Sequence, residues 1–193
     1  MGENTTPIVV MGVQGAGKST LGQLLAERLG YRFVDGDDLH TPENVAAMAA
    51  GRALTDAQRE PWLRTVGSTL SAGADDGIVV ACSALKQRYR DLLRESVPGL
   101  FVVHPAGSMQ LVAERIGQRS HQYMPAALLQ SQFDTLEPLA AGERGVTIDI
   151  ARTPQELVEA VVAALGAATA AIGTLATGTL ATGTRTERTG ADL

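Results

Sequence analysis

Five short runs of mainly apolar residues alternate along the chain with stretches in which apolar residues recur at helical spacing. The runs cover residues 8–11, 31–35, 78–82, 100–104 and 146–150. Short runs rich in β-branched residues are typical of strands buried on both faces. After the first run, Leu21, Leu25 and Leu29 lie at helical spacing, and Gly30 is placed to end that helix. The alternation predicts an α/β fold with a parallel sheet covered by helices on both faces.

The last helical stretch is predicted to begin after Thr153, which has the spacing of a capping box with Glu156. Its apolar face ends near Leu165. The sequence that follows is a near-repeat of Gly, Thr, Leu and Ala, and it fits neither a helix nor a strand period. We therefore expect one folded domain over residues 1–166 and a flexible tail rich in Gly, Ala and Thr over residues 167–193.

The charge balance and the cysteine content narrow the class of protein. The chain has 16 basic and 21 acidic residues, a net charge of -5, which argues against a nucleic-acid partner. The single cysteine, Cys82, lies in an apolar run and is expected to be a buried thiol. No apolar stretch is long enough to span a membrane, and the N-terminus does not resemble a signal peptide. We expect a cytoplasmic protein without a membrane partner.

Residues 12–19, with the sequence GVQGAGKS, fit the phosphate-binding pattern G-x-x-x-x-G-K-[ST] at every fixed position. Glycines let backbone N–H groups approach phosphates, and the helix that follows offers its positive end. Lys18 is expected to reach the β- and γ-phosphates as a catalytic residue, and the Ser19 hydroxyl to bind Mg²⁺. The predicted nucleotide-binding residues are Gly12, Val13, Gln14, Gly15, Ala16, Gly17, Lys18, Ser19 and Thr20.

Acidic residues follow the second predicted strand, whose end lies beside the first strand's end in a parallel sheet. Asp35 is predicted to orient Mg²⁺ through water, and Asp37 to accept the proton of an acceptor hydroxyl or to hold a sugar diol. The alternative is a solvated acidic turn that caps the next helix. His40 is a candidate for a substrate hydrogen bond, or for a residue that only stabilises this turn.

Several stretches together resemble the gluconokinase family of small P-loop kinases: "GVQGAGKST", "FVDGDDLH", "TPENVAAMAAGRALTDAQREPWL", "CSALKQRYRDLLR" and "LLQSQFDTLEPL". The resemblance covers Ile8 to about Leu165. It implies phosphorylation of D-gluconate at its 6-hydroxyl with ATP and Mg²⁺. It also implies a P-loop kinase fold with five strands in the order 2-3-1-4-5, a substrate-binding helical segment at about 38–72, a helical lid at about 115–127, and a homodimer.

Cations are needed for the carboxylate of gluconate and for the triphosphate. Arg59, Lys86 and Arg90 lie in the matching motifs and are candidate substrate-binding residues beside Asp37 and His40, although each can instead be an ordinary surface charge. In the expected lid, Arg115 and Arg119 are four residues apart and share a helix face. We predict that both are catalytic, because cations over the triphosphate neutralise developing charge and exclude water.

Two other functions remain open at this point. The first is another small-molecule kinase of the shikimate kinase type, which uses the same chemistry on a cyclic acid. The stretches "DLHTPENVAAM" and "DAQREPWL" favour gluconate over it. The second is a nucleotide-binding regulator that has no acceptor. The paired aspartates and the arginines argue against a regulator, because a switch needs no acceptor pocket.

Overall fold

The computed structural model describes residues 5–118 and 126–180 of the chain. Five parallel strands form one sheet in the order β2-β3-β1-β4-β5, which confirms the expected topology. The strands are β1 (Ile8–Val10), β2 (Arg32–Asp35), β3 (Ile78–Ala81), β4 (Phe101–Ala106) and β5 (Gly145–Asp149). Each overlaps one of the five apolar runs.

Seven α-helices and one short 3-10 helix connect the strands within the described residues. They are α1 (Lys18–Leu29), η1 (Gly36–Leu39), α2 (Pro42–Ala49), α3 (Asp56–Ala72), α4 (Gln87–Ser96), α5 (Met109–Gly117), α6 (Ala126–Thr135) and α7 (Pro154–Leu180). Local sequence explains several helix ends. Gly30 ends α1 in the left-handed conformation, and Thr55 and Gln58 form a capping box at the start of α3.

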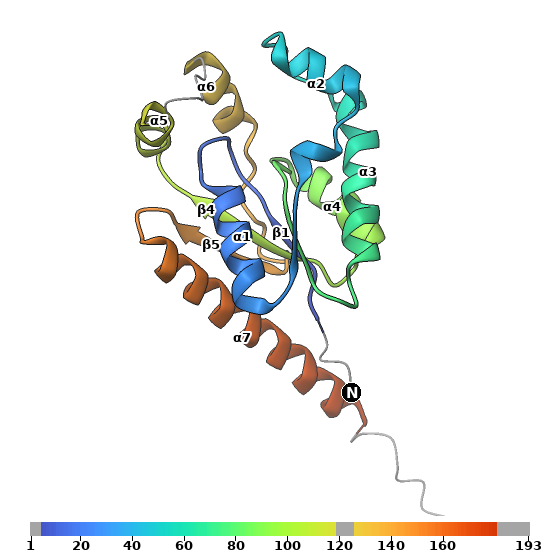
Figure 1. Cartoon of the computed structure of the whole chain (residues 1–193). Coiled ribbons are helices and arrows are strands. Elements are labelled where there is room, and N and C mark those ends of the chain that lie inside the picture. Colours follow the sequence, from blue (N-terminus) through green and yellow to red (C-terminus); the bar gives the residue numbers. More distant parts are fainter. Residues whose placement is uncertain (1–4, 119–125, 181–193) are drawn as a thin grey trace, which may run out of the picture.

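The helices cover the sheet in two layers, because successive residues of a strand face opposite sides. Ile8 and Val10 of β1 pack against α1 and α7, whereas Val9 and Met11 at the end of the same strand pack against α3 and α4. Figure 1 shows these two helix pairs on opposite sides of the strands. The apolar runs are therefore buried on both faces, as expected for a parallel sheet.

Three further helices, α2, α5 and α6, lie beyond the carboxyl ends of the strands, at the top of Figure 1. In open parallel sheets ligands bind at this end. Apolar side chains from α5 and α6 form a third cluster with Val13 and Ala16, which lie between β1 and α1. This cluster attaches both helices to the segment that carries the phosphate-binding pattern.

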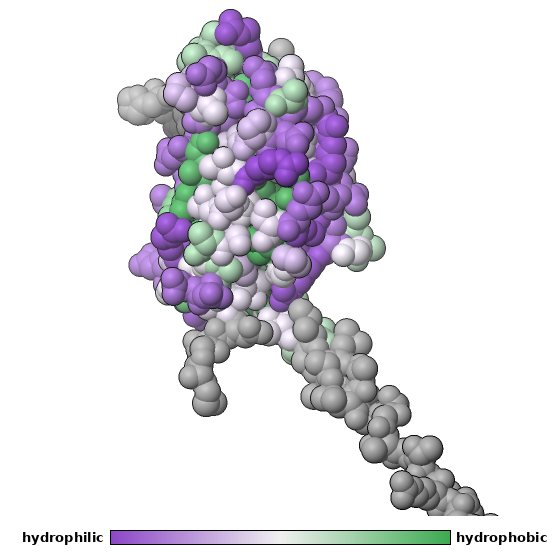
Figure 2. Space-filling view, turned by 90° about the vertical axis from the view of Figure 1, so that its right-hand side faces the viewer, coloured by the Kyte–Doolittle hydropathy of each residue, from purple (hydrophilic) through white to green (hydrophobic). Residues whose placement is uncertain are grey.

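Hydrophilic residues cover much of the molecular face at the right of Figure 1, which is shown in Figure 2. Figure 2 shows that hydrophobic residues on the face at the right of Figure 1 form small, separate patches. Val45, Met48 and Met109 are the large hydrophobic side chains that are exposed within the part of the chain that the structure describes. No helix among the described residues is both long and apolar enough to cross a membrane.

Helix α7 differs from the sequence prediction at its C-terminal end. The apolar pattern predicts an end near Leu165, but the helix continues to Leu180 and includes the first part of the Gly–Thr–Leu–Ala repeat. Alanine has the highest helix propensity of all residues and is frequent in this segment. Ala168 still packs against the cluster beneath α1 and α7, and the Thr169 hydroxyl donates to the Leu165 carbonyl at 3.0 Å. The division at residue 166 stays a prediction.

Candidate active site

The loop between β1 and α1 has the conformation of an anion site. Gly15 and Gly17 have φ angles of 85° and 90°, in the left-handed region that glycine adopts without strain. The amide N–H groups of Gly15, Gly17, Ser19 and Thr20 have no hydrogen-bond acceptor among the described residues. They lie at or just before the start of α1, where the helix dipole is positive. The loop therefore offers several donors to a phosphate group.

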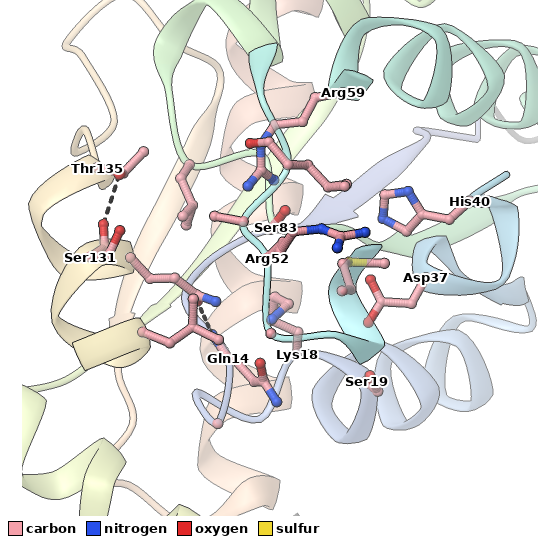
Figure 3. A pocket seen from close by; sticks show the side chains of 18 of the residues that line it. Gln14, Lys18, Ser19, Asp37, His40, Arg52, Arg59, Ser83, Ser131 and Thr135 are labelled. Atoms are coloured by element: carbon pink, nitrogen blue, oxygen red, sulfur yellow. Dashed lines mark hydrogen bonds between the residues drawn. The ribbon is translucent and has the colours of Figure 1, made fainter. Parts of the chain in front are cut away.

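A cavity of about 300 Å³ opens beside this loop. Segments far apart in the sequence line it: Gln14, Gly15, Gly17, Lys18, Ser19, Thr20, Asp37, His40, Met48, residues 51–54, Arg59, Ser83, Leu85, Leu128, Ser131, Gln132 and Thr135. Figure 3 shows Asp37 and His40 on one side and Ser131 and Thr135 of α6 on the opposite side, with Lys18 between them. The cavity joins the phosphate loop to a polar chamber that has both acids and cations.

Three of the predicted nucleotide-binding residues support the loop and do not line the cavity. The side chains of Val13 and Ala16 are buried in the cluster with α5 and α6. The Gly12 N–H donates to the Ser83 carbonyl at 3.1 Å, and the Val13 carbonyl accepts from Lys18 Nζ at 3.1 Å. These contacts hold the loop at the edge of the sheet.

The two predicted metal-binding residues are in contact. Ser19 Oγ donates to Asp35 Oδ2 at 2.7 Å, while Asp35 Oδ1 accepts from the Asp37 N–H at 3.1 Å. Hydroxyl and carboxylate oxygens are ligands that Mg²⁺ prefers. The described residues contain no group of three or more acidic, histidine or cysteine side chains that could hold a metal ion by themselves. The pair fits Mg²⁺, which commonly keeps waters and takes further ligands from substrate phosphates.

His40 lines the cavity and stacks on Trp62, and its role in substrate binding stays a prediction. The two rings stack with centroids 4.1 Å apart, and Trp62 Nε1 donates to the Gly36 carbonyl at 2.7 Å. His40 Nδ1 is buried and has no hydrogen-bond partner among the described residues. Burial lowers the pKa of His40 below its ordinary value of 6.5, although the Asp37 carboxylate opposes the shift. A neutral ring at pH 7 can both donate to and accept from a hydroxyl group.

Two arginines contribute positive charge to the cavity. Arg59 on α3 lines the cavity, and its Nε donates to the Leu54 carbonyl at 3.3 Å. Arg52, in the turn after α2, also lines the cavity and was missed at the sequence level. Its position three residues before a helix-capping threonine gives no sign that it faces a cavity. Together the two guanidinium groups suit an anionic ligand.

Lys86 does not line the cavity, contrary to the sequence prediction. Its Nζ contacts Asp56 Oδ1 at 3.3 Å, and Arg88 and Tyr89 contact the same carboxylate. Hydrogen bonds from Tyr89, Arg88 and Lys86 hold the pKa of Asp56 well below its ordinary value. Lys86 thus belongs to a surface cluster that links the start of α3 to the start of α4.

Arg90 is also outside the cavity, and its assignment to substrate binding is wrong. The residue is fully buried. Its guanidinium donates to both carboxylate oxygens of Glu143 at 2.7 Å and to the carbonyls of Ala84, Leu85, Glu137 and Pro138. Burial opposes the charge on Glu143, but hydrogen bonds from Arg90, Ala140 and Arg94 outweigh it and lower the pKa of Glu143 to about 2. The presence of a charged residue in a helical motif therefore does not show whether its side chain faces a ligand or the core.

The expected lid is described only in part, because Arg119 lies outside the described residues. Arg115 lies in the last turn of α5 and donates to the Ile150 carbonyl. It lines a second, smaller cavity that also contacts Gly17 and Thr20. Leu24, Pro105 and Leu157 are among the apolar residues of this cavity. Arg115 is therefore close to the phosphate loop but outside the main cavity, and its catalytic role stays a prediction.

Helix α6 supplies polar residues that were missed at the sequence level. Ser131, Gln132 and Thr135 line the cavity, and Gln132 Oε1 accepts from the Gln14 N–H at 2.7 Å. Their spacing is a usable signal, because residues three and four apart share one helix face. Leu129 of the same helix is buried in the cluster beneath the phosphate loop. The helix thus has an apolar side toward the loop and a polar side toward the cavity.

A buried histidine lies behind the phosphate loop. His104 of β4 is 5% exposed, and its Nδ1 has no hydrogen-bond partner among the described residues. A Cβ at Gly12 would lie 3.5 Å from the His104 ring. Burial, with a contribution from the nearby Arg90, lowers the pKa of His104 to about 4. The folded protein thus holds this ring neutral, whereas the unfolded chain protonates it near 6.5.

This difference predicts that acid destabilises the fold through His104. Between the folded and unfolded pKa values the unfolded chain binds one more proton, so stability falls as the pH falls from 6.5 toward 4. From pH 7 to pH 5 we expect a loss of about 2 kcal/mol in the free energy of unfolding. Urea unfolding of the wild type and of His104→Leu at both pH values measures it. An equal loss in the two proteins contradicts the prediction.

The fold and this site define a small P-loop kinase. The chain matches the family described as shikimate kinase over residues 14–165. It is 41% identical to the probable gluconokinase of Mus musculus, over 82% of this chain and 96% of that protein. It is 40% identical to the gluconokinase of Gluconobacter oxydans, over 84% of this chain and 92% of that protein.

A solved structure agrees with these relatives. The gluconokinase from Sinorhizobium meliloti 1021 is 43% identical to this chain and superimposes with a TM-score of 0.83. The match covers 90% of this chain and 98% of that chain. The chain belongs to the gluconokinase family, a branch of the shikimate kinase type.

Proposed function

We propose that the protein transfers the γ-phosphoryl group of ATP to the 6-hydroxyl of D-gluconate, which gives 6-phosphogluconate and ADP. One observation on the residues of this chain supports the proposed reaction. A single cavity joins the amide donors of the phosphate loop to the Asp37 carboxylate and to the guanidinium groups of Arg52 and Arg59. A sugar acid needs such a combination, because it presents hydroxyl groups and one carboxylate.

On the nucleotide side, the amides around Gly15 and Gly17 and the side chain of Lys18 bind the triphosphate. The smaller cavity beside Thr20 has apolar walls at Leu24 and Leu157, which suit the nucleoside base. Ser19 and Asp35, which are in contact, would hold Mg²⁺. When bound, Mg²⁺ neutralises part of the charge on the phosphate oxygens.

On the acceptor side, Asp37 accepts the proton of the 6-hydroxyl while the hydroxyl oxygen forms its bond to the γ-phosphorus. The bond from that phosphorus to the β,γ-bridging oxygen breaks, and ADP leaves. His40 hydrogen-bonds a hydroxyl of the sugar chain, and its stacking on Trp62 fixes the ring plane. Arg52 and Arg59 bind the carboxylate, so that the chain is held with its far end toward the phosphate loop.

An ADP-release assay with ATP and Mg²⁺ tests this function. We expect acceptor-dependent ADP release with D-gluconate, and a phosphate ester of gluconate in the products. D-Glucose tests the need for the carboxylate, and shikimate tests the other small-molecule kinase. A mock purification from the same host without this chain controls for the host's own kinases. Release that is equally fast without any acceptor, or faster with shikimate, contradicts the proposal.

A further inference from the structure

The hydrogen bond between α6 and the phosphate loop has a defined direction. A backbone N–H can only donate, so the side-chain oxygen of Gln132 must face the Gln14 N–H, which lies 2.7 Å away. The NH₂ group of the same amide then points away from the loop, and it has no acceptor among the described residues. Gln132 lines the cavity, so this NH₂ group is available to an anionic or hydroxyl ligand there. Figure 3 shows the bond as a dashed line at Gln14.

The position of Gln132 depends on a rigid attachment at the C-terminal end of α6. The Glu137 N–H donates to the Leu85 carbonyl at 2.8 Å, and the buried Arg90 donates to the Glu137 carbonyl at 3.2 Å. Leu136 packs against two of the three apolar clusters. The last turn of α6 is therefore fixed to the segment that follows β3. Gln132 lies one helical turn before that attachment.

The phosphate loop has other contacts besides this hydrogen bond, and one of them, from Lys18 Nζ to the Val13 carbonyl, lies at the cavity. The Gly12 N–H bonds to Ser83, and Val13 and Ala16 are buried. Gln14 itself is half-buried, and Gln132 of α6 is its hydrogen-bond partner. Removal of this bond leaves the apolar contacts of α6 intact but takes away the hydrogen bond that joins Gln14 to α6.

We propose that Gln132 is a positioning residue for phosphoryl transfer. It fixes the Gln14 end of the phosphate loop through its carbonyl oxygen and holds its NH₂ group toward the group being transferred. This inference rests on the proposed function for the identity of the reaction. The contact between Gln132 and the loop is independent of that function. A misplaced phosphoryl group lowers the rate of transfer more than it weakens the binding of either substrate.

Two variants of Gln132 and one matched control test the proposal. Gln132→Met keeps the length of the side chain and removes both hydrogen-bonding groups. Gln132→Glu keeps an acceptor for the Gln14 N–H but loses the NH₂ donor and adds negative charge. Gln130→Met is the control, because Gln130 lies on the same helix, is exposed, does not line the cavity, and its side chain donates to Asp134.

For Gln132→Met we expect kcat with gluconate to fall roughly ten- to a hundredfold, with little change in KM for ATP or gluconate. Hydrogen–deuterium exchange in peptides that cover residues 12–19, measured without nucleotide, should become faster in this variant. Gln132→Glu should lower kcat and keep the slow exchange. Gln130→Met should match the wild type in both measurements.

Wild-type kcat in Gln132→Met, or loop exchange as slow as in the wild type, overturns the proposal. If Gln132→Met does not fold, Gln132→Glu decides: low kcat with slow exchange supports the proposal, and wild-type kcat overturns it. If the wild type shows no gluconate-dependent ADP release, the proposed function fails instead. The exchange measurement then still decides whether Gln132 fixes the loop.

Discussion

Asp37→Asn is expected to lower kcat for gluconate phosphorylation by about a hundredfold or more, with little change in KM for ATP. Asp37 lies in η1, and its carboxylate faces the cavity that the phosphate loop also lines. An asparagine has nearly the same shape but cannot accept the proton of the attacking hydroxyl. The neighbouring Asp35 is not placed to replace it, because Asp35 does not line the cavity and its carboxylate accepts from Ser19 and from the Asp37 backbone N–H.

The chain offers a matched control for this change. Asp38 is the next residue in the same 3-10 helix, is also exposed, and does not line the cavity. Asp38→Asn removes the same charge from the same turn and should leave kcat close to the wild-type value. A comparable loss in both variants shows that general charge near the site is responsible. A near-normal rate in Asp37→Asn shows that Asp37 does not accept the proton.

The part of the site that was predictable is the part built by local sequence. The phosphate loop has a fixed pattern between a strand and a helix, and its glycine spacing reports the backbone conformation directly. Asp35 and Asp37 follow a strand that ends at the same edge of the sheet as β1. A parallel sheet brings these two segments together whatever the intervening sequence does. The strand order itself came from the family resemblance, since a set of apolar runs does not specify it.

The cationic residues were less predictable, because a motif records which residue is present and not which way it points. Arg90 lies in "CSALKQRYRDLLR" as a plausible ligand, yet its partner Glu143 is distant in the sequence and brings it into the core. Conversely, Arg52 and Gln132 reach the cavity through the packing of α2 and α6. That packing depends on long-range contacts, such as the one between Glu137 and Leu85.

The buried pair of Arg90 and Glu143 makes the second large prediction. Arg90→Met is expected to lower the free energy of unfolding by about 3–5 kcal/mol, measured by urea unfolding at pH 7. The guanidinium is fully buried, and the Glu143 side chain is only 4% exposed. Loss of the guanidinium leaves the buried Glu143 carboxylate with fewer hydrogen-bond donors. It also removes the hydrogen bonds that Arg90 donates to four backbone carbonyls.

An exposed ion pair on the same protein is the control. Arg28 and Glu159 link α1 to α7 at 3.4 Å, and their side chains are 51% and 56% exposed. Arg28→Met should cost less than about 1 kcal/mol, because water screens and replaces the contact. Equal losses in the two variants contradict the assignment of Arg90 to the core.

A double variant separates two contributions to the loss of stability in Arg90→Met: the buried charge of Glu143, left without Arg90, and the loss of the hydrogen bonds from Arg90. Glu143→Met added to Arg90→Met removes the carboxylate that Arg90→Met leaves without its main partner, so the double variant should regain part of the lost stability. Arg94, the other cation on Glu143, is 20% exposed and can turn toward water. If Arg90 instead bound gluconate, Arg90→Met would raise KM for gluconate and leave the urea midpoint unchanged. The seven hydrogen-bonding contacts that surround this guanidinium in the folded protein argue for the loss of stability.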